Sequence, residues 1–192
     1  MKVKISKQVF ILGMVSLFTD IASEMLYPVT PIFLTVVLGS SMAVVGLIEG
    51  IAEVTSGLLK GYFGNLSDKL GKRSIFVVFG YGISALAKSL PGIFQNIPVV
   101  LTSRVSDRIG KGIRTAPRDA LLASYSNGNS GAVFGFHRAL DTWGAAIGPV
   151  LALALLNFYP NNFQLIFLAA FVPSVIAVVF TLFVKDNDAS SN

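Results

Sequence analysis

The segment 104–119, RVSDRIGKGIRTAPRD, places seven charged residues within sixteen positions of a strongly apolar chain. At 3.6 residues per turn, all seven project within an arc of about 140° on one side of a helix. Ionisable groups at bilayer depth are costly unless they pair or face water. A stripe of this kind therefore predicts a polar interior in which a solute binds or passes. The stripe consists of Arg104, Asp107, Arg108, Lys111, Arg114, Arg118 and Asp119.

The composition around this stripe is that of an integral membrane protein. Of the 192 residues, 53% are hydrophobic and 13% are charged, about half the charged share of an ordinary soluble domain. The lack of cysteine excludes disulfides and thiolate metal sites, and a single histidine excludes a His-rich metal cage. The net charge of +5 lies in short loops or apolar helices, so we expect no nucleic-acid partner. We predict no catalytic residue, no cofactor and no metal.

Six apolar stretches in the chain are each long enough for the roughly 20 residues that a membrane-spanning helix needs. Short breaks rich in Gly, Pro, Asn or Ser separate them. The predicted spans are 9–38, 42–65, 74–91, 97–125, 131–157 and 163–184. We therefore expect residues 1–192 to form one all-α transmembrane domain, surrounded by membrane lipids.

The lysines and arginines outside these spans all fall on one side of the predicted topology. By the positive-inside rule that side is cytoplasmic. Both termini are therefore expected in the cytoplasm, with the chain in the plasma or inner membrane. The residues counted are Lys2, Lys4, Lys7, Lys69, Lys72, Arg73 and Lys185.

The charges inside the spans are shared unevenly. The first, second, fourth and fifth spans carry most of them, the third carries only Lys88 and the sixth carries none. We expect the four charged spans around a polar interior, and the third and sixth outside against lipid. Because the first and fourth spans carry the most charge and the second and fifth follow, the pattern predicts two equivalent three-helix units, an inverted three-plus-three repeat.

A motif follows the second span. Residues 64–73, GNLSDKLGKR, resemble the signature Gly-x-x-x-Asp-(Arg/Lys)-x-Gly-(Arg/Lys)-(Arg/Lys) between the second and third helices of the major facilitator superfamily. Residues 108–112, RIGKG, resemble the Arg-x-x-Gln-Gly motif of that family, with Lys111 in place of glutamine. Residues 144–149, GAAIGP, resemble its Gly-x-x-x-Gly-Pro motif, whose trailing glycine pair is absent here.

The resemblance implies one half of a transporter that works by alternating access. A typical member of the family has twelve helices in two parallel halves, and this chain resembles the first. A second six-helix half, as a parallel homodimer or a heterodimer, would complete a split transporter; alternatively, the chain is a fragment of a longer protein. The resemblance also implies a gating role for the motif, whose carboxylate pairs in one conformation and releases in the other. The implied gating residues are Gly64, Asp68, Gly71, Lys72 and Arg73.

Depth along the helices predicts which charges meet. With a rise of 1.5 Å per residue, Asp20 lies about 17 Å from the cytoplasmic face, while Arg104 and Arg108 lie about 10 to 16 Å from the outer face. The first-span carboxylates Asp20 and Glu24 are therefore expected opposite these arginines. The candidates for substrate binding or coupling are Asp20, Glu24, Glu49, Glu53, Arg104, Asp107, Arg108, Lys111 and Asp141.

The fourth span carries five bases and two acids, and guanidinium groups bind carboxylate or phosphate in a two-pronged fashion. We therefore predict a small anionic or zwitterionic solute, with Asp20 and Glu24 as proton acceptors or as ligands for a cationic group. The alternative is an internal salt-bridge network that binds nothing. Two other functions stay open: a non-transporting accessory or scaffold subunit, and a membrane-embedded enzyme acting on lipid headgroups. Against the enzyme, the chain has no HExxH motif.

Proline and glycine predict bends and close contacts. Pro117 should kink or break the fourth span, and Pro28 and Pro31 should bend the first. Glycine pairs four residues apart predict seams where helices pack closely. These pairs are Gly46 with Gly50, Gly57 with Gly61, Gly131 with Gly135, and Gly144 with Gly148.

Overall fold

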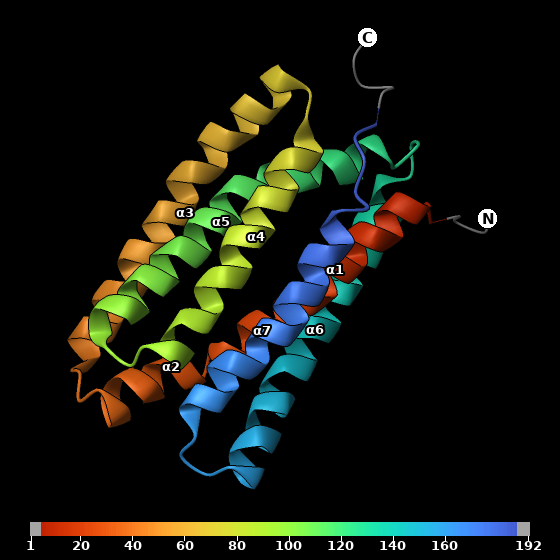
Figure 1. The fold of residues 1–192 in the computed structure, drawn as a ribbon. Coiled ribbons are helices and arrows are strands. Elements are labelled where there is room, and N and C mark those ends of the chain that lie inside the picture. The colour runs from red at the N-terminus through yellow and green to blue at the C-terminus, as the bar shows by residue number, and fades with distance from the viewer. Residues whose placement is uncertain (1–4, 188–192) are drawn as a thin grey trace.

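The computed structural model describes residues 5–187, which form a bundle of helices with no strand in that range (Figure 1). The first span consists of α1 (Lys7–Leu26), the single turn α2 (Val29–Ile32) and the π-helical η1 (Phe33–Val37). The other spans are α3 (Met42–Leu70), α4 (Arg73–Ile93), α5 (Ile97–Ser124), α6 (Ser130–Phe158) and α7 (Phe163–Thr181). Lys2 and Lys4, which entered the prediction of orientation, lie outside the described residues.

Five of the six described spans are long and apolar enough to cross a membrane. The exception is α5, whose charged stripe lowers its hydropathy although its 28 residues are more than long enough. Because α5 packs against α3 and α4, it runs through the bundle with the other helices. The chain is a multi-pass membrane protein with six transmembrane helices, as the sequence predicted.

Polar residues set where several helices begin. Their side-chain oxygens each accept a hydrogen bond from a backbone N–H in the first turn, which satisfies one of the donors that a helix leaves unpaired. Such caps precede α1, α3, α5 and α7, at Ser6, Ser41, Asn96 and Asn162. The short breaks seen in the sequence are therefore helix starts as well as turns.

Proline has different effects in the first and fourth spans. α1 ends at Leu26 and Pro28 lies in the turn before α2, so the first span is interrupted at its prolines. In contrast, α5 continues through Pro117 without a break, and the prediction of a broken segment there is wrong. A proline removes only one backbone hydrogen bond, and α5 is held on two sides by α3 and α4.

The helix contacts follow an inverted repeat. α1 packs against α6 and α7, α5 packs against α3 and α4, and α4 and α7 meet in the middle. Exchanging α1 with α5, α3 with α6 and α4 with α7 leaves this pattern of contacts unchanged. Figure 1 shows α1, α6 and α7 on one side and α3, α4 and α5 on the other, so the two three-helix repeats interleave in space. The start of α1 and the end of α7 lie at the same end of the bundle, here called the terminal end. The predicted three-plus-three architecture is confirmed.

Each of α4 and α7 keeps an exposed apolar face, which includes Phe79 and Leu86 on α4 and Val172 and Val179 on α7. Such faces suit contact with lipid, as expected for the third and sixth spans, but α3 and α6, the second and fifth spans, are less buried in the described chain than α4 and α7. However, Lys88, which the sequence placed in the outer third span, is buried with 4% of its surface exposed. The third span therefore contributes to the polar interior as well as to the lipid-facing surface.

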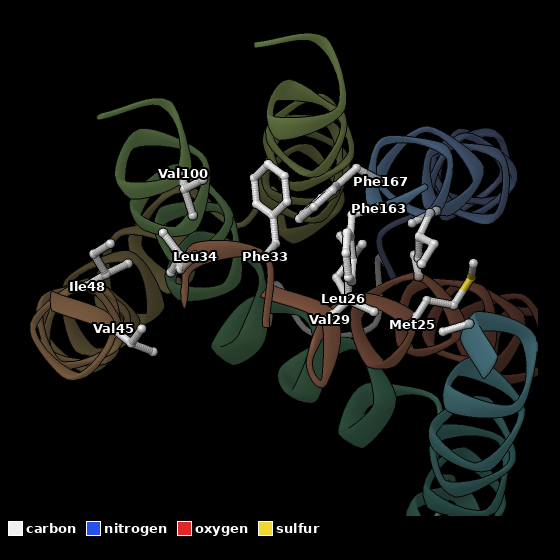
Figure 2. Packing of buried hydrophobic residues seen from close by; sticks show 14 of the residues in the cluster. Met25, Leu26, Val29, Phe33, Leu34, Val45, Ile48, Val100, Phe163 and Phe167 are labelled. Carbon is white, nitrogen blue, oxygen red and sulfur yellow. The ribbon is translucent and has the colours of Figure 1, made fainter. Parts of the chain in front are cut away.

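Two apolar clusters lie at opposite ends of the bundle. At the far end, Phe33 and neighbouring side chains of the first span pack against the starts of α3, α5 and α7 (Figure 2). The ring of Phe33 meets that of Phe167 edge-on, with centroids 5.2 Å apart. At the terminal end, Leu12 and Val15 of α1 pack with Val77 of α4 and Leu121 of α5. The charged stripe of α5, from Arg104 to Asp119, therefore lies between two apolar layers.

Only one of the four predicted glycine seams packs within the described chain. A Cβ added to Gly144 or Gly148 of α6 would lie 2.5 Å or 2.7 Å from a backbone oxygen of α1. The glycines of the other three pairs, on α3 and α6, have no described atom within 4 Å of such a Cβ, so the prediction is wrong for this part of the chain. A close contact that the spacing missed joins α4 to α5 at Gly80 and Gly110. Gly80 and Gly110 lie on different helices, so the spacing of glycines within one span could not predict their contact.

Candidate functional site

Two adjoining polar cavities lie between the apolar clusters. The distal cavity, of about 90 Å³, is nearer the far end and is lined by residues of α1 and α5. The proximal cavity, of about 340 Å³, is nearer the terminal end and is lined by residues of α1, α3, α4, α5 and α6. Asp20, Lys111 and Arg114 line both. The cavities are therefore neighbours along α5, on the side where α5 faces α1.

The distal cavity brings together Asp20, Glu24, Arg104 and Arg108, the charges expected to face one another. Their direct ion pairs, however, lead to α3. Arg104 donates two hydrogen bonds to Glu49, Nε to Oε1 at 2.7 Å and Nη2 to Oε2 at 2.6 Å. This two-pronged geometry is the strongest that an arginine forms with a carboxylate.

Arg108 also turns toward α3, where its Nε lies 3.5 Å from Oε2 of the largely exposed Glu53. Both arginines therefore lie near a carboxylate of α3, but the buried Nε of Arg108 has no hydrogen-bond partner among the described residues. Glu24 has no ion pair among the described residues, and it lines the distal cavity without a cationic partner of its own. The α1 acids and the α5 arginines therefore line the same cavity, as their depth predicted, but they form no direct ion pairs with each other.

Asp107 is held by α4. Its Oδ1 lies 2.8 Å from Nζ of Lys88, and its backbone oxygen accepts a hydrogen bond from the hydroxyl of Ser84. One turn away, the hydroxyl of Ser103 donates to the backbone oxygen of Ala87 at 2.7 Å. The close approach of the two backbones at the α4–α5 glycine contact makes these bonds possible. Asp107 thus joins α5 to α4, and it also lines the distal cavity.

Arg114 is equally committed to α4. Its guanidinium carbon lies 4.2 Å from the centre of the Tyr81 ring, a cation–π contact. The same guanidinium donates to the backbone oxygen of Gly80 and to the hydroxyl of Ser84. Arg118 pairs with the adjacent Asp119, Nη2 to Oδ1 at 2.9 Å. These two arginines line the proximal cavity, and each donates two hydrogen bonds to groups of the chain.

The carboxyl groups of Asp20 on α1 and Asp141 on α6 lie in hydrogen-bonding contact. Asp141 also accepts a hydrogen bond from the hydroxyl of Ser16 and pairs with Arg138, Nη1 to Oδ2 at 3.0 Å. Gly144 brings the helices together here, because a Cβ on it would lie 3.0 Å from that of Asp20. Both carboxyl groups line the proximal cavity where α1 and α6 pack together.

Two lysines complete the proximal cavity. Lys60 of α3 and Lys111 of α5 both line it, and neither forms an ion pair with any described residue. The remaining bases around the two cavities each have a partner within the chain. Lys111 was among the predicted site residues because it belongs to the charged stripe of α5. Lys60 was not, because it lies on a helix with two acids and no other nearby base.

The gating motif is mostly helical. α3 continues to Leu70, so only Gly71 and Lys72 lie between α3 and α4, and the longer break predicted between the spans 42–65 and 74–91 is wrong. Gly71 adopts a left-handed φ of +64°, which glycine takes without strain. Asp68 pairs with Arg73, Oδ1 to Nη2 at 2.9 Å, across this turn. Gly64 lies where a Cβ would be 3.0 Å from that of Ala116 on α5.

A segment after α7 holds the start of α4. Asp186 accepts hydrogen bonds from the backbone N–H of Ser74 at 2.9 Å and from its hydroxyl at 2.6 Å. The neighbouring Lys185 bonds through its backbone to the side chains of Gln8 on α1 and Tyr125 after α5. The segment therefore ties the gating turn to the terminal ends of α1 and α5. Nothing in the local sequence around Asp186 marked this contact.

Comparisons with known proteins agree with the geometry. The family model of the Major Facilitator Superfamily matches residues 12–192. An uncharacterized MFS-type transporter of Methanocaldococcus jannaschii is 39% identical over 190 residues, which cover 98% of this chain and 47% of that protein. Quinolone resistance protein NorA of Staphylococcus aureus is 26% identical over 145 residues, which cover 75% of this chain and 37% of that protein.

The crystal structure of peptide transporter POT in complex with sulfate superimposes with a TM-score of 0.76 at 16% sequence identity. The match covers 92% of this chain and 37% of that one, and at this identity it bears on the fold alone. This chain spans less than half the length of each of these three proteins.

Proposed function

Because the chain belongs to the Major Facilitator Superfamily, we propose that it forms the N-terminal half of a secondary transporter for a small anionic or zwitterionic solute. The observation that carries this proposal is the pair of charged cavities at the middle of the bundle, enclosed between two apolar clusters. A solute held at such a site becomes accessible from one side or the other when an apolar end opens. This is alternating access.

The competing functions explain the cavities less well. A scaffold that only packs on another membrane protein has no use for Lys60, Lys111 and Glu24 at bilayer depth without ion-pair partners in the described chain, because such groups are costly there. A lipid-headgroup enzyme is opposed by the family, which is one of transporters. The charged interior is therefore better explained by a solute pathway than by packing or catalysis.

We further propose that transport is coupled to protons at Asp20 and Asp141. A carboxyl pair that shares one proton can release it when the cavity opens and water reaches the pair. Three other candidate acids are paired with bases, Glu49 with Arg104, Glu53 with Arg108 and Asp107 with Lys88, while Glu24 lines the distal cavity, away from this pair. The coupling role thus narrows from the predicted candidates to the pair on α1 and α6.

The gating role of the motif at 64–73 stays a proposal of the same kind. The Asp68–Arg73 pair fastens the turn at the terminal end in this conformation and would exchange partners in another. The pathway would be completed by a second six-helix half, either in the same polypeptide or as another chain in the same orientation. We place the transporter in the plasma or inner membrane with the terminal end in the cytoplasm, in line with the positive-inside rule.

The test is solute-dependent proton movement in everted membrane vesicles from cells that express the chain together with any co-purifying second half. The solutes are panels of small carboxylates, phosphate esters and amino acids, and a pH-sensitive dye reports protons. We expect at least one solute class to move protons, Asp20→Asn to abolish the signal, and Asp20→Glu to retain part of it because the carboxyl remains. Uptake of a labelled solute without proton movement would reject the coupling alone. Failure of every solute to cross would reject transport.

A further inference from the structure

Bases that have no acidic partner within the chain are the candidates to bind the anionic group of the solute. We infer that Lys60 and Lys111 together bind an oxyanion group of the solute, a carboxylate or a phosphoryl group, in the proximal cavity. This assignment rests on the proposed function, because it names the substrate subsite of the same pathway. It also moves the anion site away from Arg104 and Arg108, the arginines that the sequence favoured.

The first step is the state of the arginines. Arg104 donates two hydrogen bonds to Glu49. Arg108 Nε lies 3.5 Å from Oε2 of Glu53. An anion at Arg104 would have to displace the carboxylate of Glu49, whereas Arg108 Nε is buried without a hydrogen-bond partner among the described residues. The distal cavity is also small, about 90 Å³, and Asp20 and Glu24 add negative charge to its wall. It is therefore a poor site for an anion.

The second step concerns the arginines of the proximal cavity. Arg114 is fixed by Tyr81, Ser84 and the backbone of α4, while Arg118 pairs with Asp119. Arg138 is paired with Asp141 and is otherwise turned outward, with 81% of its side chain exposed. These groups shape the cavity and its potential, but their short contacts are made to the protein. That leaves the two lysines.

The third step is the placement of the lysines. α3 and α5 make a close contact at Gly112, where an added Cβ would lie 2.7 Å from Cβ of Leu59 and 3.5 Å from the backbone nitrogen of Lys60. Lys60 and Lys111 are the direct neighbours in sequence of the two residues that make this contact. Their backbones are therefore close together on two different helices, and both residues line the same cavity. Two ammonium groups that line one cavity from separate helices suit the oxygens of one oxyanion.

The side of the proximal cavity opposite the lysines carries carboxyl groups. Asp20 and Asp141 come from α1 and α6, so the proximal cavity carries carboxyl groups on one side and the two lysines on the other. A solute anion at the lysines would face the shared proton of the carboxyl pair rather than a bare carboxylate. The volume of about 340 Å³ is near the lower end of the roughly 300–1,000 Å³ of small-molecule sites, which fits a small solute.

The test uses purified chain with any co-purifying second half, and inorganic phosphate and acetate as probes. Thermal unfolding is followed against each probe at ionic strength held constant with chloride. We expect stabilisation of the unmodified chain by at least one probe, and Lys60→Gln or Lys111→Gln to weaken the apparent affinity about tenfold, as for loss of one charged hydrogen bond. Lys60→Arg and Lys111→Arg keep the charge and should restore much of the affinity.

Two further variants separate the assignment from its rivals. Lys7→Gln removes an exposed lysine at the start of α1 and should leave the response to both probes unchanged. Arg104→Gln should lower the unfolding temperature through loss of the Glu49 pair while leaving the affinity for the probe intact. If Arg104→Gln abolishes the response and the lysine variants retain it, the anion binds at the distal cavity and the inference is wrong. If neither probe stabilises the unmodified chain, the oxyanion seat is also rejected, whereas proton-coupled flux in vesicles would still support the proposed transport.

Discussion

The ion pair between Lys88 and Asp107 allows a quantitative test of how this bundle holds its charges. Lys88 Nζ lies 2.8 Å from Asp107 Oδ1, and the two side chains are only 4% and 10% exposed. Lys88→Met removes the cation but keeps a long unbranched side chain, so Asp107 stays buried with its partner gone. Breaking a buried pair in this way costs about 3–5 kcal/mol, whereas an exposed surface pair contributes about 0–1 kcal/mol.

The assay is the free energy of unfolding in detergent micelles, measured by titration with SDS and followed by circular dichroism. We expect Lys88→Met to lose about 3–5 kcal/mol, and the double variant Lys88→Met with Asp107→Leu to recover most of this, because no charge is then left buried. Arg73→Gln is the control, since it breaks the exposed pair with Asp68 and should cost about 1 kcal/mol or less. Equal losses for Lys88→Met and Arg73→Gln, or a double variant that loses the sum of its two single variants, would refute the reasoning.

Two other predictions concern packing and capping. Gly112→Ala should lower the unfolding temperature, because the new Cβ would lie 2.7 Å from that of Leu59 and force α3 away from α5. Gly57→Ala on the open face of α3 meets nothing within 4 Å and should be neutral or stabilising by up to about 1 kcal/mol through helix propensity; a larger loss there than at Gly112 would contradict the packing argument. Asp186→Asn should destabilise the chain by about 1 kcal/mol, because it removes the negative charge that accepts hydrogen bonds from Ser74 at the start of α4. Hydrogen exchange at the start of α4 should therefore rise. Unchanged exchange there would show that the segment after α7 does not hold α4.

The sequence was sufficient to predict the helices and their symmetry, because both follow from local patterns. Apolar length predicts spans, and the unequal charge of the spans predicts the inverted repeat that the helix contacts display. The helical period also predicts which α5 residues share a face. It does not determine which neighbour each side chain meets, since that depends on how α5 is rotated between α3 and α4.

Arg104 and Asp107 illustrate this limit. They are one turn apart on the same face, yet Arg104 turns to Glu49 on α3 and Asp107 to Lys88 on α4. Depth along the membrane placed Arg104 level with the α1 acids, but a shared level does not decide between two acidic helices. A clue to the α4 contacts existed in the hairpin itself. Residues equally far from Gln95 in α4 and α5 face each other, as the bond from Ser103 to Ala87 shows.

The carboxyl groups and the lysines on opposite sides of the proximal cavity suggest how binding of a solute and of a proton would be linked. α1 and α5 make few contacts with each other, so the carboxyl wall and the lysine wall face across open space rather than across packed side chains. On the proposed function, an anion bound at Lys60 and Lys111 cancels the positive field that favours ionised carboxylates at Asp20 and Asp141, and so favours the shared proton. Linkage is reciprocal, so the proton must favour the anion by the same factor. A site built this way binds the anion and the proton together, which favours their movement in the same direction over their exchange.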